Sequence, residues 1–133
     1  MENDLVQIKT ITFPTLVAVT PDEHATGLMW KKWPPPVMCF PYRNAEVRKF
    51  WMKNCLSPLD IVFCKDGKVI SICYGEPLST KQVGPNYPSD LVVELPHGTA
   101  VKCGINVGDD VKLQRTTRTI ARDIQDIFKR LSR

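Results

Sequence analysis

Asp66 and Gly67 lie between two runs of mostly apolar side chains, residues 59–65 and 68–74. An Asp-Gly pair between such runs favours a tight two-residue turn, because both residues readily adopt a positive φ. The turn then fixes the cross-strand pairs: Lys65 with Lys68, Phe63 with Ile70, and Ile61 with Ile72. The sequence therefore predicts an antiparallel hairpin in the middle of the chain, with one strongly apolar face.

Further strand-like runs occur through most of the chain. Beyond the hairpin, we expect strands at 15–19, 37–40, 47–53, 91–95 and 111–113. Many short strands separated by turn residues indicate a β-sandwich or a β-barrel. Alternation of side chains along the strands selects the predicted core residues, which are Phe50, Met52, Ile61, Phe63, Ile70 and Ile72.

Two short helices are expected within this β-rich part. Thr20 can cap the first helix, Pro21 suits its first position, and Glu23 can complete a capping box. Gly27 is expected to end that helix. A second helical turn is predicted over 99–103.

The stretch from Thr117 to Leu131 has the spacing of an amphipathic helix. Its apolar residues form one stripe: Ile120, Ile124, Ile127, Phe128 and Leu131. We expect this stripe to pack on the chain's own sheet, with a homodimer contact as the alternative. Binding of nucleic acid or of an anionic surface by the Arg-rich face is the least favoured of the three interpretations.

The positive charge of the chain is concentrated in the same region. From Lys112 onward, seven basic and two acidic residues give a net charge of +5, whereas the rest of the chain has eleven basic and twelve acidic residues. The nearly neutral remainder of the chain lacks the excess of basic residues that is typical of a nucleic-acid-binding domain. We therefore divide the chain into a β domain, residues 1–113, and a basic amphipathic helix, residues 114–133.

Length and cysteine content limit the class of protein. A chain of 133 residues fits a single domain, and no apolar run approaches the roughly 18 residues of a membrane-spanning helix. Residues 1–4 lack the basic and apolar segments that begin an export signal. Five cysteines without a Cys-x-x-Cys pair argue against a disulfide framework or a zinc site. A soluble protein in the reducing cytoplasm is the expectation.

Three segments carry a family resemblance. They are residues 20–29, which begin Thr-Pro and end Gly-Leu-Met, residues 50–63, and residues 91–96 followed by 104–109. In this order they resemble a bacterial and archaeal family, number 192 among the domains of unknown function. The resemblance implies a small, mostly antiparallel, closed β-barrel with one or two short helices, and it implies no activity. Cys55 stands where the family usually has Thr.

The bend within residues 50–63 holds the most varied set of polar and aromatic side chains, namely Trp51, Lys53, Asn54 and Asp60. They can serve structure alone, because Asn54 can hold a turn and Asp60 can accept from Lys53 or from backbone N–H groups. They can also form a shallow site for a small polar ligand such as a sugar or an anion. Trp30, together with Tyr87 and Ser89 from a long loop, is a candidate for the rim of that site.

No catalytic residue, metal ligand or cofactor site is predicted. His24 and His97 are distant in sequence and lack a third ligand at metal spacing, and no Gly-rich phosphate loop is present. The leading hypothesis is a non-enzymatic binding or accessory module. A hydrolase or isomerase that uses Asp60 with Lys53 is one alternative, and it requires the two side chains to converge on one point. A protein-interaction module acting through the C-terminal helix is another.

Overall fold

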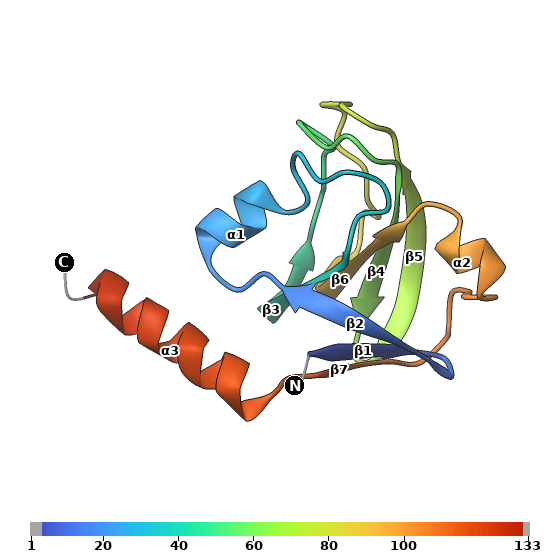
Figure 1. Cartoon of the computed structure of the whole chain (residues 1–133). Helices are drawn as coiled ribbons and strands as arrows, with labels where there is room; N and C mark the ends of the chain where they lie inside the picture. The colour runs from blue at the N-terminus through green and yellow to red at the C-terminus, as the bar shows by residue number, and fades with distance from the viewer. Residues whose placement is uncertain (1–3, 132–133) are drawn as a thin grey trace.

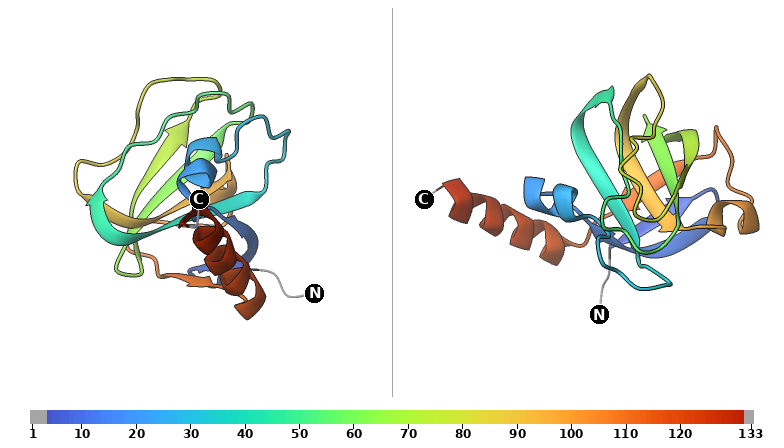
Figure 2. Two further views of the ribbon diagram at one scale, coloured as in Figure 1. Left: turned by 90° about the vertical axis from the view of Figure 1, so that its left-hand side faces the viewer. Right: turned by 90° about the horizontal axis from the view of Figure 1, so that it is seen from above.

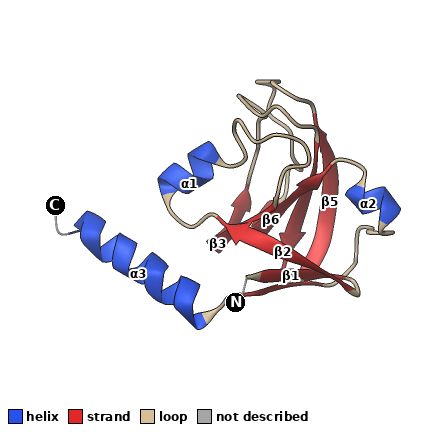
Figure 3. Ribbon diagram, viewed as in Figure 1, coloured by secondary structure: helices blue, strands red, loops and turns tan. Residues whose placement is uncertain are grey.

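The computed structural model describes residues 4–131, which form one mixed sheet and three helices (Figures 1 and 3). In chain order the elements are β1 (Leu5–Ile8), β2 (Ile11–Val17), α1 (Pro21–Thr26), β3 (Val37–Val47), β4 (Leu59–Lys65), β5 (Lys68–Gly75), β6 (Pro88–Pro96), α2 (Thr99–Lys102), β7 (Val111–Gln114) and α3 (Thr117–Leu131). The strand order across the sheet is β5-β4-β6-β3-β2-β1-β7. The sheet curves into an open half-barrel, so the prediction of a mainly β fold with short helices is confirmed.

The prediction that the barrel is closed is wrong. Most strand pairs are antiparallel, as predicted, but one pair is parallel and the sheet is therefore mixed. β2 and β3 pair in parallel, with Thr15 opposite Val37, because the connection through α1 returns the chain in the same direction. β5 and β7 are the two edges of the sheet. β7 is only four residues long and pairs with β1. At one end the two edges approach each other, where Lys68 forms an isolated bridge with Asp110 and the N–H of Val111 donates to the carbonyl of Gly67 at 2.9 Å.

The hairpin forms as predicted at its turn and differs beyond it. Asp66 and Gly67 have φ values of 51° and 75°, and the pairs next to the turn are Lys65 with Lys68 and Cys64 with Val69. A β-bulge between Phe63 and Cys64 then shifts the register by one residue. The predicted pairs are replaced by two others, Phe63 with Ser71 and Ile61 with Cys73.

The predicted strand over 47–53 is wrong, because β3 ends at Val47 and the chain then leaves the sheet. Phe50 forms an isolated bridge with Val83, and the N–H of Met52 donates to the carbonyl of Ser79 at 2.8 Å. The apolar side chains that suggested a strand instead cover one face of the sheet.

Both faces of the central strands are buried, and side chains alternate between two clusters. Val62, Cys64, Val93 and Leu95 face the hollow of the half-barrel, together with residues of β1, β7 and α2. Their neighbours in β4 and β6 face the outer side, where residues following α1 and the segment 50–55 cover them. Of the predicted core residues, Met52, Ile61 and Phe63 are fully buried, and the other three are partly buried.

The helix α3 extends away from the sheet, as two further views show (Figure 2). The five residues of its apolar stripe are exposed to solvent by 41 to 74%. The expectation that this stripe packs on the chain's own sheet is therefore wrong. No helix within residues 4–131 is long and apolar enough to cross a membrane.

Candidate binding pocket on the outer face of the sheet

A pocket of about 240 Å³ lies on the outer face of the sheet. Its walls come from α1 and the residues after it, from β3, and from the segment 49–55. The side chains that give it chemical character are His24, Phe40, Tyr42, Lys49, Phe50, Trp51, Lys53, Gln82 and Glu94. The pocket is thus largely aromatic, with cationic groups from one segment and a single carboxyl group from the sheet.

The carboxyl group belongs to Glu94 in the middle of β6. Glu94 pairs with Met38 of β3 and with Ile61 of β4, so it lies on a central strand of the sheet. Because Val93 and Leu95 face the hollow of the half-barrel, the Glu94 side chain faces outward. Only 3% of its surface is exposed. Within residues 4–131 no side chain or backbone group forms a hydrogen bond or ion pair with it.

Burial of the Glu94 carboxyl raises its pKa from 4.5 to about 8. Removal from water disfavours the ionised form, and no cation in the described part of the chain forms an ion pair with Glu94. The side chain is therefore mostly uncharged at neutral pH. Buried ionisable groups with strongly shifted pKa values gather at functional sites, because groups that bind or react need a pKa matched to their task.

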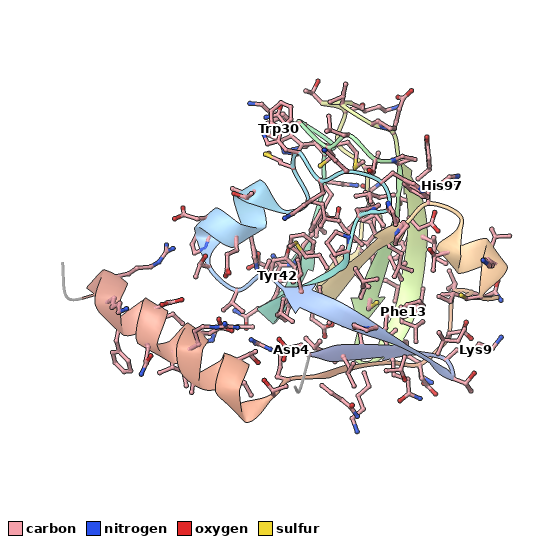
Figure 4. The ribbon with its side chains drawn as sticks, in the orientation of Figure 1. Asp4, Lys9, Phe13, Trp30, Tyr42 and His97 are labelled. Carbon is pink, nitrogen blue, oxygen red and sulfur yellow. The ribbon has the colours of Figure 1, made fainter. Side chains whose placement is uncertain are left out.

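The aromatic walls are fixed by their mutual contacts. The His24 ring meets the Tyr42 ring edge-on with centroids 5.0 Å apart, and Phe40 meets Phe50 in the same way at 5.1 Å. The Nε2 atom of His24 lies 2.8 Å from the carbonyl oxygen of Ala18, which can only accept, so Nε2 carries the proton. Figure 4 shows Tyr42 on the side of the sheet near α1. Such contacts hold the rings in place before any ligand arrives.

The phenol of Tyr42 and the thiol of Cys55 stay protonated. Burial raises the pKa of Tyr42 to about 12, and the Arg48 guanidinium stacks over the phenol ring, 3.4 Å from its centroid. Burial also raises the pKa of Cys55 to about 11, with the nearby Glu94 adding to the effect. A thiol in that state is a poor nucleophile.

Two lysines lie on the segment beside the pocket. Lys53 stacks over the indole of Trp51, with its Nζ atom 5.3 Å from the ring centroid. Lys49 donates to the carbonyl of Gly84 at 2.5 Å and to the side-chain oxygen of Asn86 at 2.8 Å. Lys49 therefore attaches the long loop before β6 to the segment that lines the pocket.

The structure brings two of the four predicted site residues together. Trp51 and Lys53 both line the pocket, and 45% of the Trp51 surface is exposed. Asn54 serves the turn instead: its φ is 59°, and its carbonyl accepts the N–H of Trp30 at 2.8 Å. Whether any of these residues binds a ligand remains a prediction.

Asp60 is placed on the other face of β4, toward α2. One carboxylate oxygen lies 2.9 Å from Nδ1 of His97, and the other accepts the N–H groups of Gly98 and Ala100 at 3.1 and 2.9 Å. These contacts hold the chain where α2 begins. Figure 4 shows His97 close to the start of that helix. Asp60 and Lys53 therefore do not converge on one point, as a shared catalytic role would require.

The predicted rim residues do not line the pocket. Trp30 and Tyr87 are exposed at 64 and 52%, outside the pocket walls. Ser89 is fully buried, and its hydroxyl oxygen has no hydrogen-bond partner among the described residues.

Glu94, Tyr42 and His24 were not predicted as site residues. Glu94 could have been recognised, because it is the one charged residue within the apolar run from Leu91 to Leu95. A carboxyl group in a central strand has to face a core or a cavity. Tyr42 and His24 carry no comparable signal, since only the folded sheet brings them together.

No group of three or more His, Cys, Asp and Glu side chains in the described part of the chain is arranged to hold a metal ion. The fold and the pocket define a small half-barrel protein with one aromatic cavity floored by a buried carboxyl group. The chain belongs to the family of domain of unknown function 192, described as "Uncharacterized ACR", whose model matches residues 5–113.

Solved structures that are similar to this chain include two bacterial proteins. A protein of unknown function from Novosphingobium aromaticivorans has 29% identity and a TM-score of 0.76, over 81% of this chain and 83% of that one. A Sinorhizobium meliloti protein described as "a putative transcription regulator" has 28% identity and a TM-score of 0.76, over 83% of this chain and 92% of that one. No curated protein matches the chain.

Proposed function

We propose that this chain is a non-enzymatic binding module that takes a small polar ligand bearing hydrogen-bond donors, such as a sugar, into the pocket over Glu94. One observation carries this proposal: a buried carboxyl group, which has no hydrogen-bond partner among residues 4–131, lies in an aromatic cavity. A hydroxyl or amino group that donates to Glu94 would supply the hydrogen bonds that it lacks. Buried polar groups are stable only when such bonds are made.

The shape and lining of the pocket favour a sugar over a small anion. A volume of about 240 Å³ suits a single ring, being just below the roughly 300–1,000 Å³ of sites for larger ligands. Trp51 and Phe50 offer ring faces on which the apolar side of a sugar can stack. For an anion the pocket offers Lys53 and Lys49, and Lys49 already donates to Gly84 and Asn86. The Glu94 carboxyl group offers an anion no positive charge.

The hydrolase or isomerase alternative has less support. Both oxygens of Asp60 are engaged by His97 and by the N–H groups that begin α2. Glu94 is the only acidic residue among the pocket-lining residues described, whereas glycoside hydrolysis usually needs a pair of carboxyl groups. We also infer a reducing compartment such as the cytoplasm, supported by five free cysteines.

A ligand screen with two tryptophan variants tests the proposal. Monosaccharides, amino sugars, small amines and inorganic anions are titrated against the chain, and indole fluorescence and melting temperature are recorded. We expect a sugar or amino sugar to bind and Trp51→Ala to weaken that binding at least about tenfold. Trp30→Ala is the matched control, because Trp30 is equally aromatic and lies outside the pocket. Equal effects of the two substitutions, or binding of anions alone, would rule the proposal out.

A further inference from the structure

The helix α3 turns its polar side to the body and its apolar stripe to solvent. Arg115 pairs with Asp123, and Nη2 of Arg130 lies 3.2 Å from the carboxylate of Asp22 in α1. The opposite side exposes Ile120, Ile124, Ile127, Phe128 and Leu131. The right-hand view in Figure 2 shows this helix standing clear of the sheet. An isolated helix of about 15 residues is only marginally stable in water, so a partner for the stripe would be strongly favourable.

The spacing within the stripe is that of a coiled-coil seam. Ile120, Ile124, Ile127 and Leu131 follow one another at intervals of four, three and four residues. These intervals place them at successive d, a, d and a positions of a heptad, the narrow stripe that another helix of the same kind covers. The seam therefore matches a second α3 in period as well as in chemistry.

We propose that two copies of this chain associate through α3 as an antiparallel pair of helices. In the register that aligns the seams, Ile124 of one copy packs against Ile127 of the other, and Ile120 packs against Leu131. The association is independent of the pocket, because α3 contributes no residue to it.

The residues beside the seam select the antiparallel orientation. Asp123 and Arg130 occupy the flanking g positions, and antiparallel packing sets Asp123 of each copy against Arg130 of the other. On the opposite flank, the small Ala121 then faces the large Phe128. A parallel pair would instead place Asp123 beside Phe128 and bring the two Arg130 ends together.

The contacts that these residues make within one chain leave them able to pair. The Arg130 and Asp22 side chains are 47 and 81% exposed, and an exposed ion pair contributes little stability. Asp123 is more enclosed, with 19% of its side chain exposed, and its Oδ2 atom accepts from Arg115. The contact with Arg130 of the second copy is made at that exposed part. Because the seam spans only four apolar layers, we expect a dimer that depends on protein concentration.

Measurement of mass against concentration tests the association. Light scattering or sedimentation on the full chain is expected to rise from 15.1 kDa toward twice that mass as the protein is concentrated. Ile124→Glu should raise the dissociation constant at least about tenfold, whereas the neighbouring Gln125→Glu, off the seam, should leave it unchanged. A chain that stays monomeric throughout, or a dimer that Ile124→Glu does not weaken, overturns the proposal.

A charge exchange tests the orientation. Asp123→Arg and Arg130→Asp should each weaken self-association, because each sets like charges against one another. An equimolar mixture of the two variants should restore the dimer as a heterodimer, since both cross-pairs then join opposite charges. The substitutions break the same contacts within each chain whether mixed or separate, so recovery on mixing reports only the contact between copies. A dimer with no recovery on mixing overturns the antiparallel register.

Discussion

The carboxylate of Asp60 accepts the N–H of Ala100 at 2.9 Å, across the end of the half-barrel from β4 to α2. The same carboxylate accepts from Gly98 and from the ring of His97. The residue that the sequence offered as a ligand contact thus connects two elements that are forty residues apart in the chain.

Asp60→Ala is expected to destabilise the fold without altering the pocket. The substitution leaves two backbone N–H groups without an acceptor in a buried place, at a cost of about 2–4 kcal/mol in the free energy of unfolding. Urea denaturation measures that loss. Asp110→Ala, at an exposed carboxylate, should change the free energy of unfolding by less than about 1 kcal/mol. Loss of ligand binding by Asp60→Ala at unchanged stability would contradict the structural role.

Glu94→Gln is expected to remove one component of the dependence of stability on pH. Between pH 4.5 and about 8 the folded protein keeps the Glu94 proton while the unfolded chain loses it. Because the native state then binds more protons, the free energy of unfolding falls as pH rises through this range, by up to about 1.4 kcal/mol per pH unit. Above about pH 8 both states are ionised and this component no longer changes.

Urea denaturation at several pH values from 5 to 9 measures the slope. The Gln variant should have a smaller fall than the unsubstituted chain and should be the more stable of the two at pH 8. Glu46→Gln, at a mostly exposed carboxyl group, serves as the control and should retain the original slope. Identical slopes in all three proteins would show that the Glu94 carboxyl titrates normally.

Thr20→Ala is expected to weaken the start of α1, which forms part of the pocket wall. The Thr20 hydroxyl accepts the N–H of Glu23 at 3.2 Å, and the Glu23 carboxylate accepts the N–H of Thr20 at 2.9 Å. Loss of this capping contact should cost about 1 kcal/mol in the free energy of unfolding. Thr10→Ala, in the exposed turn between β1 and β2, is the control. A cap that contributes nothing would give the two variants equal melting temperatures.

Gly84→Ala is expected to disturb the loop that Lys49 attaches to the pocket. A Cβ atom at Gly84 would lie 2.6 Å from the carbonyl oxygen of Arg48 and 3.1 Å from the Phe63 ring. Gly98 also has a positive φ, but a Cβ atom there meets nothing within 4 Å. Both substitutions strain the backbone, so the difference between them isolates the collision, for which we expect about 1–3 kcal/mol in chemical denaturation. Equal losses would mean that the loop yields freely.

The parts of the fold that depend on neighbouring residues were predictable from the sequence. The hairpin turn at Asp66, the capping box at Thr20 and the helix from Thr117 to Leu131 all form where their local signals placed them. The β-bulge after Phe63 was not predictable, because alternation of apolar residues fits either register when both faces of β4 are buried. The segment 47–53 misled for the same reason: apolar alternation shows that side chains are buried and does not show that the backbone joins a sheet.

The candidate site was predictable only in part. Trp51 and Lys53 stand out in sequence and line the pocket, whereas Asp60 was grouped with them by closeness in the chain. The chain lies outside the sheet at Trp51 and enters β4 only at Leu59. Alternation along β4 then places Asp60 on the same face as Val62, opposite to Ile61 and the pocket. Pairing of β6 with β3 and β4 brings Glu94 to the pocket, and such pairing is a long-range property that local patterns do not encode.

β4 and β6 are buried on both faces. The pocket lies on one face of these strands and the interior of the half-barrel on the other, so both depend on the same backbone. A change in the packing of Val62 or Val93 would move the strands that carry Ile61 and Glu94, so the base of the pocket is tied to the stability of the whole domain. The residues after α1 and the segment 49–55 line the pocket and do not contribute to the interior of the half-barrel. Under the proposed binding function, family members with different ligands are therefore expected to differ in these walls and to keep the strands beneath them.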